Sequence, residues 1–486
     1  MKYGFDNDRY LRIQSEHIRE RISKFGGKLY LEMGGKLFDD HHASRVLPGF
    51  QPDSKLRMLS HLRDKAEIVI VISAADIDKN KVREDLGITY DMDVLRLRDE
   101  FQKRGFLVGS VVITHYNGQI SADAFRSRLE RMGIRSYVHY LIEGYPTNVS
   151  LIASDDGFGR NDYIETSREL IIVTAPGPGS GKMAVCLSQL YNEHKRGIEA
   201  GYAKFETFPV WSLPLKHPVN IAYEAATADL NDVNMIDPFH LEAYGKTAVN
   251  YNRDIEIFPV LNALFEGIYG TNPYKSPTDM GVNMVGFCIS DDAVCCEASY
   301  NEIIRRYFTA LNRLAQADGN DAEVNKIALL FKQAKIDISY RRPVEAARSR
   351  ALSSGVPCSA LELPDGTIIT AETSPLLGPS AALLLNAVKH LAGIDHDLKL
   401  IPQEMITPIQ HTKTEYLRSH NPRLHTDEVL VALSVLSTRN PDCRKSLEVL
   451  PLLDGCQMHS TVMLGEVDHK IFKKLGVGLT CDPVRK

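Results

Sequence analysis

The sequence has no apolar run long enough to span a membrane and little excess charge of either sign. Its 57 Lys and Arg residues nearly balance 62 Asp and Glu residues, for a formal net charge of −5. This balance predicts no overall attraction to nucleic acid or anionic lipid. The first 22 residues lack the apolar core of a secretory signal, and the eight cysteines form no C-x-x-C pair. We therefore expect a cytoplasmic protein with reduced thiols that binds neither nucleic acid nor membrane.

Several catalytic signatures are also missing. There is no H-E-x-x-H metalloprotease motif, no H-x-E with P-C-x-x-C deaminase motif, and no G-x-S-x-G nucleophile elbow. Seven of the 16 histidines nevertheless lie between positions 390 and 469. Metal-dependent hydrolysis in the C-terminal part is thus one alternative function, and its candidate ligands are His411, His420, His459 and His469.

The pattern of apolar runs predicts an α/β fold. Strand-like runs occur at Lys28–Met33, Glu67–Ser73, Leu107–Thr114, Ser136–Ile142, Leu170–Thr174 and Asn220–Ala226. Amphipathic stretches between several of them favour a mostly parallel sheet flanked by helices. Helical spacing dominates residues 254–269, 297–317, 322–336 and 343–352, and residues 367–394 again read as strand, loop and helix. We predict an N-terminal α/β domain (1–229), a mainly helical section (230–353) and a C-terminal α/β domain (354–486).

A glycine-rich loop follows one predicted strand and opens a helix. Residues 170–191 read LIIVTAPGPGSGKMAVCLSQLY. The backbone N–H groups of such a turn and the positive end of the helix dipole attract an anion, most often a phosphate. This P-loop-like turn matches the Walker A pattern only in part, because Pro176 replaces the first glycine and Met183 replaces the Ser or Thr that contacts Mg²⁺. The predicted phosphate-binding residues are Gly177, Gly179, Ser180, Gly181 and Lys182. Alternatively, the glycines only let the helix pack closely on the sheet.

A second Gly-Lys turn follows the first predicted strand, and its predicted binding residues are Gly34, Gly35 and Lys36. Ligands of open parallel sheets bind outside the carboxyl ends of the strands, so both turns are expected along the same edge. Acidic, imidazole and guanidinium groups follow the turn within ten residues. The candidate catalytic residues are Lys182, Asp39, Asp40, His41 and Arg45. Alternatively, residues 34–45 form a solvated surface loop.

The expected cofactor depends on whether the bound phosphate group belongs to a nucleotide. ATP or another nucleotide, together with Mg²⁺, is a candidate. Asp155, Asp156 and Asp162 could hold Mg²⁺ through water and so compensate for Met183, although such a string is also typical of a turn. Asp76 and Asp78, which follow the run EIVIVIS, are equivalent candidates.

Several long strings together resemble one protein family from end to end: MKYGFDNDRYLRIQSEHI, LYLEMGGKLFDDHHASRVLPGF, IIVTAPGPGSGKMAVCLSQLY, NEIIRRYF and GCQMHSTVMLGEVDHKIFKKLGV. The family comprises bacterial proteins of unassigned function, found in Gram-positive organisms and others. The resemblance implies successive α/β, helical and α/β subdomains. Some members are labelled ATP-dependent peptidases, but the sequence contains no protease motif, and the family supplies no catalytic residues to transfer.

These observations favour a homo-oligomeric protein that binds a phosphorylated small molecule. If it is an enzyme, we expect phosphoryl transfer or phosphate-ester hydrolysis, in which Lys182 and Arg45 stabilise developing charge. Asp39, Asp40 or His41 would then handle protons or a metal ion. The alternative from another class is a non-catalytic oligomeric sensor or assembly protein, whose helical middle section supplies the subunit contacts.

Overall fold

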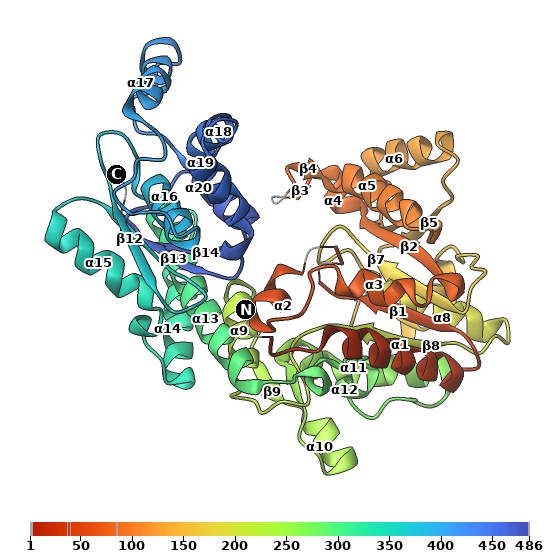
Figure 1. The fold of residues 1–486 in the computed structure, drawn as a ribbon. Coiled ribbons are helices and arrows are strands. Elements are labelled where there is room, and N and C mark those ends of the chain that lie inside the picture. The colour runs from red at the N-terminus through yellow and green to blue at the C-terminus, as the bar shows by residue number, and fades with distance from the viewer. Residues whose placement is uncertain (1–2, 36, 39, 84–85, 485–486) are drawn as a thin grey trace. The chain divides into compact units, whose positions relative to one another are not determined.

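A computed structural model describes residues 3–35, 37–38, 40–83 and 86–484 (Figure 1). The chain forms two compact units. Of the described residues, those within 3–224 and 231–296 form the sheet unit, and those within 225–230 and 297–484 form the C-terminal unit. This division does not test the predicted boundaries at 229 and 353, which remain predictions. None of the helices among the described residues is both long and apolar enough to cross a lipid bilayer.

The sheet unit is built on a six-stranded sheet in the order β6-β5-β2-β7-β1-β8. Every neighbouring pair is parallel, which confirms the predicted parallel sheet. The strands are β1 (Leu29–Met33), β2 (Ala66–Ser73), β5 (Leu107–Tyr116), β6 (Ser136–Tyr140), β7 (Leu170–Thr174) and β8 (Gly201–Phe205). All residues of β1, β2 and β7 are buried, as expected for apolar strands covered on both faces.

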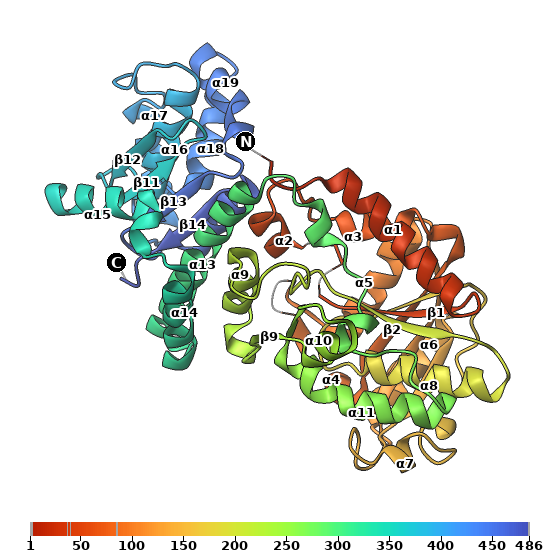
Figure 2. The same ribbon diagram turned by 90° about the horizontal axis from the view of Figure 1, so that it is seen from below.

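Two helices form the apolar core on one face of this sheet: α8 (Lys182–Lys195) and α11 (Asn252–Tyr269) (Figure 2). Their apolar side chains pack with every second residue of the central strands, such as Ile171 and Val173 of β7. The other longer helices of this unit are α1 (Asn7–Lys24), α5 (Tyr90–Lys103) and α6 (Ile120–Arg131).

Shorter elements complete the sheet unit. They are α2 (His41–Val46), α3 (Ser54–Ser60), α4 (Ala74–Asp78), β3 (Val82–Arg83), β4 (Ile88–Thr89), α7 (Val149–Ile152), β9 (Asn234–Ile236), α10 (Pro238–Tyr244), β10 (Val249–Tyr251), α12 (Pro277–Met280) and α9 (Pro218–Ala226), whose last two residues belong to the C-terminal unit. The predicted strand at Asn220–Ala226 is wrong, because these residues lie in α9. A short apolar run does not distinguish a buried strand from a buried helix, and Pro218 favours a helix start through its fixed φ.

The C-terminal unit contains a four-stranded mixed sheet in the order β12-β11-β13-β14. β11 (Cys358–Glu362) pairs antiparallel with β12 (Ile368–Glu372) and β13 (Gln457–Ser460), whereas β14 (Gly478–Cys481) runs parallel to β13. The helices are α13 (Asp292–Ala315), which begins in the sheet unit, α14 (Asp321–Ala334), α15 (Arg342–Ser354), α16 (Pro379–Leu391), α17 (Gln403–His411), α18 (Thr426–Leu436), α19 (Pro441–Glu448) and α20 (Glu466–Lys474). The predicted helical section and the C-terminal strand-loop-helix are thus confirmed.

Candidate functional site

The two glycine turns lie at the carboxyl edge of the parallel sheet. β1 pairs with β7 so that Glu32 lies opposite Val173. The Gly34–Gly35 turn and the loop at 175–181 therefore leave neighbouring strands at the same edge, as predicted. Because β7 lies between β2 and β1, the loop occupies the middle of this edge.

Glycine is required at several positions of the loop. Gly179 and Gly181 have φ values of 74° and 83°, in the left-handed region that side chains disfavour. Gly181 also caps α8, which begins at Lys182. A Cβ atom on Gly177 would lie 2.3 Å from the Tyr90 hydroxyl oxygen, whereas one on Gly179 would meet nothing within 4 Å. The tip of the loop at Gly179 is thus open, whereas Tyr90 covers the side near Gly177 and Thr114 and His115 lie against Gly181.

Two hydroxyl groups hold the carbonyl groups of the loop. Thr114 Oγ1 donates to the Ser180 carbonyl oxygen at 2.6 Å, and Ser180 Oγ donates to the Gly177 carbonyl oxygen at 2.7 Å. In a planar trans peptide the N–H points opposite to the carbonyl group, so the Gly181 N–H points away from Thr114. Within the described part of the chain, no protein acceptor contacts the N–H groups of residues 182–184, the first turn of α8. The loop therefore presents donors where an anion is expected.

His115 is a second feature of this edge, and sequence reasoning missed it. It lies near the end of β5 with a φ of 51°, and its Nδ1 is 3.1 Å from Ser73 Oγ at the end of β2. A Cβ on Gly181 would lie 3.4 Å from His115 Cε1. Burial lowers the pKa of His115, and Asp76 partly opposes this shift. The available signal was a polar residue at the end of each apolar run, where parallel strands place their ligands.

The second turn uses its acidic residue for structure. Asp40 Oδ1 accepts from Ala43 N at 3.1 Å and thereby caps α2, while Asp40 Oδ2 is 2.8 Å from the buried Lys55 Nζ. Burial acts to raise the pKa of Asp40, but Lys55, the backbone N–H of Ala43 and His42 together outweigh it, and the net pKa is lowered. His41 is exposed and Arg45 half-buried, both within α2. Two other predicted site residues, Lys36 and Asp39, lie outside the described residues.

The structure places Asp155 too far from this loop for the predicted Mg²⁺ role. Asp155 Oδ1 accepts from Tyr191 and Lys195, near the end of α8 opposite Lys182. A 14-residue helix is about 20 Å long, so Asp155 and a phosphate at Lys182 cannot share one ion. Asp162 Oδ2 accepts from the backbone of β6, at Val138 N. Among the candidate acids, Asp76 and Asp78 lie in α4, which directly follows β2 at the carboxyl edge.

The histidines of the hydrolase alternative do not form a metal-binding group. Across the described ranges, the only His, Cys, Asp or Glu group with suitably close ligand atoms is His217, Asp292 and Cys296. His217 Nδ1 accepts from Val219 N at 3.3 Å, so Nε2 has the hydrogen and donates to Asp292 Oδ1 at 2.9 Å. Metal binding would need the lone pair of Nε2, and the observed bonds therefore fit a hydrogen-bonded pair better than a metal site.

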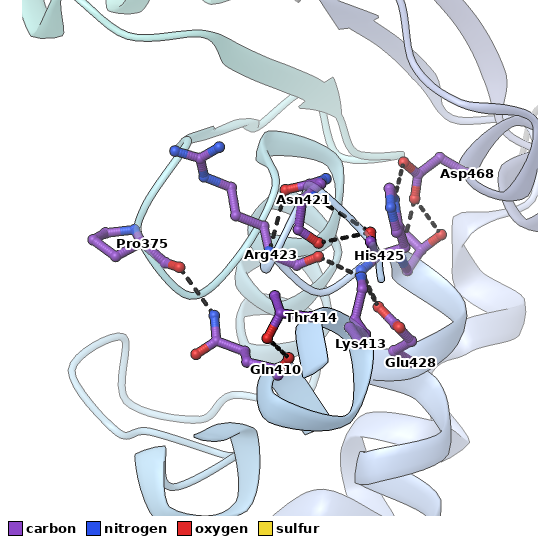
Figure 3. A network of polar contacts seen from close by, with 11 residues as sticks. Pro375, Gln410, Lys413, Thr414, Asn421, Arg423, His425, Glu428 and Asp468 are labelled. Carbon is purple, nitrogen blue, oxygen red and sulfur yellow. Dashed lines mark hydrogen bonds and ion pairs between the residues drawn. The ribbon is translucent and has the colours of Figure 1, made fainter. Parts of the chain in front are cut away.

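Polar side chains in the histidine-rich region stabilise the chain between α17 and α18 (Figure 3). Lys413 Nζ donates to the Arg423 carbonyl oxygen at 2.7 Å and to Glu428 Oε2 at 2.8 Å. Asp468 of α20 accepts from Thr426 N at 3.0 Å and lies 3.3 Å from His425 Nδ1. A hydrogen bond to Asp468 raises the pKa of His425. These contacts cap α18, and the network has a structural role.

The fold and the loop define an α/β protein with a glycine-rich strand-turn-helix that lacks the Mg²⁺-binding hydroxyl group. The chain belongs to the DUF1846 family: the N-terminal domain of unknown function DUF1846 matches residues 3–335, and the C-terminal DUF1846 domain matches residues 339–486. The resemblance that the sequence indicated is thereby confirmed.

Similar proteins extend over nearly the whole chain. A UPF0371 protein of Corynebacterium urealyticum is 57% identical over 99% of this chain and 97% of its own length. A UPF0371 protein of Corynebacterium aurimucosum is 58% identical over the same shares of the two chains. A UPF0371 protein of Streptococcus thermophilus is 55% identical over 99% of this chain and 98% of its own. The relatives thus support the family without indicating a substrate.

Proposed function

We propose that the sheet unit binds a phosphorylated metabolite or nucleotide at Gly177–Lys182. The main support is the loop geometry: Thr114 and Ser180 hold the carbonyl groups of the loop, while the N–H groups at the start of α8 have no acceptor among the described residues. Preorganised donors of this kind favour an anion because they need no rearrangement when it binds.

Electrostatics adds to this support. Lys182 is the first residue of α8, so its ammonium group adds a full charge to the positive end of the helix dipole. Gly179 is open to solvent, which leaves room for a phosphate and the group attached to it. If the ligand is a nucleotide with Mg²⁺, the carboxylate of Asp76 would make up for the metal-binding hydroxyl group that Met183 lacks, in competition with Lys81, whose Nζ lies 3.2 Å from Asp76 Oδ1.

If a reaction occurs at this site, we propose phosphoryl transfer or phosphate-ester hydrolysis. Lys182 would stabilise the charge that develops on the phosphoryl oxygens. Of the acid–base candidates, His115 lies next to Gly181, whereas the carboxylate of Asp40 is already bound by Lys55 and the start of α2. The proposal therefore shifts the proton-handling role from Asp40 to His115.

The experiment measures binding of inorganic phosphate, ATP, ADP and sugar phosphates by calorimetry and thermal shift, each with and without Mg²⁺. Lys182→Ala is expected to lower affinity about 10- to 100-fold, because a charge-assisted hydrogen bond contributes about 1.5–3 kcal/mol. Lys195→Ala, at the opposite end of α8, is the matched control and should bind as the wild type does. Equal affinity of the wild type and Lys182→Ala for every phosphate ligand would refute the proposal.

A further inference from the structure

A small cavity in the sheet unit lies beside a cluster of buried charged groups. Its volume is about 40 Å³. Because a water molecule needs about 10–15 Å³ by the same measure, the cavity has room for a group of about three heavy atoms. Its lining includes Lys204, Glu206, Phe208, Trp211, Asn250 and Asp254. These residues come from the end of β8, the segment after it, β10 and the first turn of α11.

The hydrogen bonds of Lys204 are already complete. Its Nζ lies 2.8 and 2.7 Å from the two carboxylate oxygens of Asp254 and 2.6 Å from the Tyr251 hydroxyl oxygen. Burial acts to lower the pKa of Lys204, but Asp254 and Glu206 outweigh it and the net pKa is raised. Lys204 therefore stays charged and neutralises one carboxylate, that of Asp254.

Glu206 is left as the carboxylate without a full counter-charge. Tyr251 OH is 2.7 and 2.6 Å from its two oxygens, and Lys204 Nζ is 3.2 Å from Oε1. Burial raises the pKa of Glu206 to about 7, with Asp254 and Glu32 adding to the shift and Lys204 and Tyr251 opposing it. Lys204, Asp254 and Glu206 together carry a charge of −1 unless Glu206 binds a proton, and the nearby Glu32 adds to the negative field at Glu206.

The remaining walls are suited to a cation. The aromatic residues Phe208 and Trp211 belong to the lining, and the faces of aromatic rings attract ammonium groups. Trp211 is held in place because its Nε1 donates to the Asn283 carbonyl oxygen at 2.8 Å. An anionic guest would meet the unneutralised carboxylate of Glu206. Charge and wall chemistry together therefore favour a small cation over an anion or a neutral group.

We propose that this cavity binds a primary ammonium group, either the ammonium ion itself or the amino end of a small metabolite, with Glu206 as its counterion. The amine would occupy the place that a proton on Glu206 otherwise fills. This inference does not depend on phosphate binding at Gly177–Lys182, because it rests on a different set of residues.

Competition with a proton gives the site a defined pH dependence. A primary ammonium group stays charged below about pH 9, whereas Glu206 loses its proton near pH 7. Affinity should therefore rise about tenfold per pH unit below pH 7 and level off above it. The titratable groups that face Glu206 are Lys204 of β8, Tyr251 of β10, Asp254 of α11, Glu32 of β1 and Tyr223 of α9.

The experiment titrates the full chain with methylammonium chloride at constant ionic strength, set with sodium chloride, and follows thermal stability between pH 6 and pH 8. Saturable stabilisation that increases with pH is expected, and Glu206→Gln should abolish it. Glu256→Gln makes the same change at an exposed position of α11 and should retain it. No saturable effect on the wild type, or the same effect on Glu206→Gln, would refute the proposal.

Two further arms keep the test decisive if Glu206→Gln folds poorly. Tyr251→Phe removes the hydroxyl that lowers the pKa of Glu206, so the midpoint of the pH dependence should move upward while binding persists at high pH. An unmoved midpoint would contradict Glu206 as the counterion. Potassium chloride in place of the amine should stabilise less than methylammonium. Equal stabilisation by potassium would show a general monovalent-cation site and overturn the assignment to an amine.

Discussion

His139 should make the sheet unit sensitive to mild acid. The side chain is buried in β6, and its Nε2 lies 3.1 Å from the Asp162 carbonyl oxygen, to which it donates. Its Nδ1 is buried and has no hydrogen-bond partner among the described residues. Burial therefore lowers the pKa of His139 from 6.5 to about 4. The folded protein keeps this imidazole neutral at a pH where the unfolded chain protonates it.

The sign and size follow from linkage. Because the folded pKa is below the unfolded one, the stabilisation is complete above pH 6.5 and is lost as the pH falls from 6.5 to about 4. The largest loss of unfolding free energy that this shift can cause is about 3.4 kcal/mol, because the pKa differs by 2.5 units and each unit corresponds to about 1.36 kcal/mol. At pH 5 most of the unfolded chains, but few of the folded ones, are protonated at His139. The loss in unfolding free energy from pH 7.5 to pH 5 is then about 2 kcal/mol.

Urea denaturation at several pH values measures this loss. The only tryptophan, Trp211, lies in the same unit as His139, so its fluorescence follows the relevant unfolding. His139→Gln retains an N–H donor for Asp162 but cannot titrate, and it should lose about 2 kcal/mol less than the wild type between pH 7.5 and pH 5. His61→Gln, at an exposed position, should lose as much as the wild type. Identical losses for the wild type and His139→Gln would refute the reasoning.

Two further predictions concern buried ionic contacts. Asp40→Asn should lower the unfolding free energy by about 3 kcal/mol, because Lys55 would remain buried without its counter-charge. Urea titration measures this loss. As a control, Lys55→Met should lower the unfolding free energy less in the Asp40→Asn background than in the wild type. Asp468→Asn should cost about 1–3 kcal/mol by weakening its contacts with Thr426 and His425. Amide hydrogen exchange at the start of α18 should speed up, and unchanged exchange of the Thr426 amide would contradict the structural role of the network in Figure 3.

The sequence predicted the buried strands, the glycine-rich turn and the edge of the sheet at which the turns lie. A run such as EIVIVIS, rich in β-branched residues, favours a strand buried on both faces, and it forms β2. The spacing of Gly177, Gly179 and Gly181 predicted a turn, and two of these residues adopt left-handed backbone conformations. The shared edge of the two turns followed from parallel pairing. The strand and the turn depend on their own residues, whereas the shared edge also depends on the pairing of β1 with β7.

The failed predictions depended on tertiary structure: on the course of a helix and on which side chains meet in the fold. The acids at 155–162 looked close to the loop in sequence, but Asp155 contacts α8 at Tyr191 and Lys195, about 14–20 Å along the helix from Lys182. Asp40 looked like a free acid because the sequence does not show that Lys55 folds against it. A polar side chain that appears reactive in a sequence can already be bound in the structure, and its partner decides which role remains.

The charged groups beside the cavity show that a charge imbalance can arise from tertiary contacts alone, so that the sequence does not reveal it. Lys204 and Glu206 lie two residues apart at the end of a strand, a spacing that is common for exposed charged residues. Asp254 is an ordinary acid in the first turn of a helix. Only the approach of β10 and α11 to the end of β8 places two carboxylates around one ammonium group. Burial makes a carboxylate without a counter-charge unfavourable, so that the carboxylate must take up a proton or bind a cation. A buried excess of one negative charge beside aromatic walls is therefore informative about a ligand, although none of its residues is unusual in the sequence.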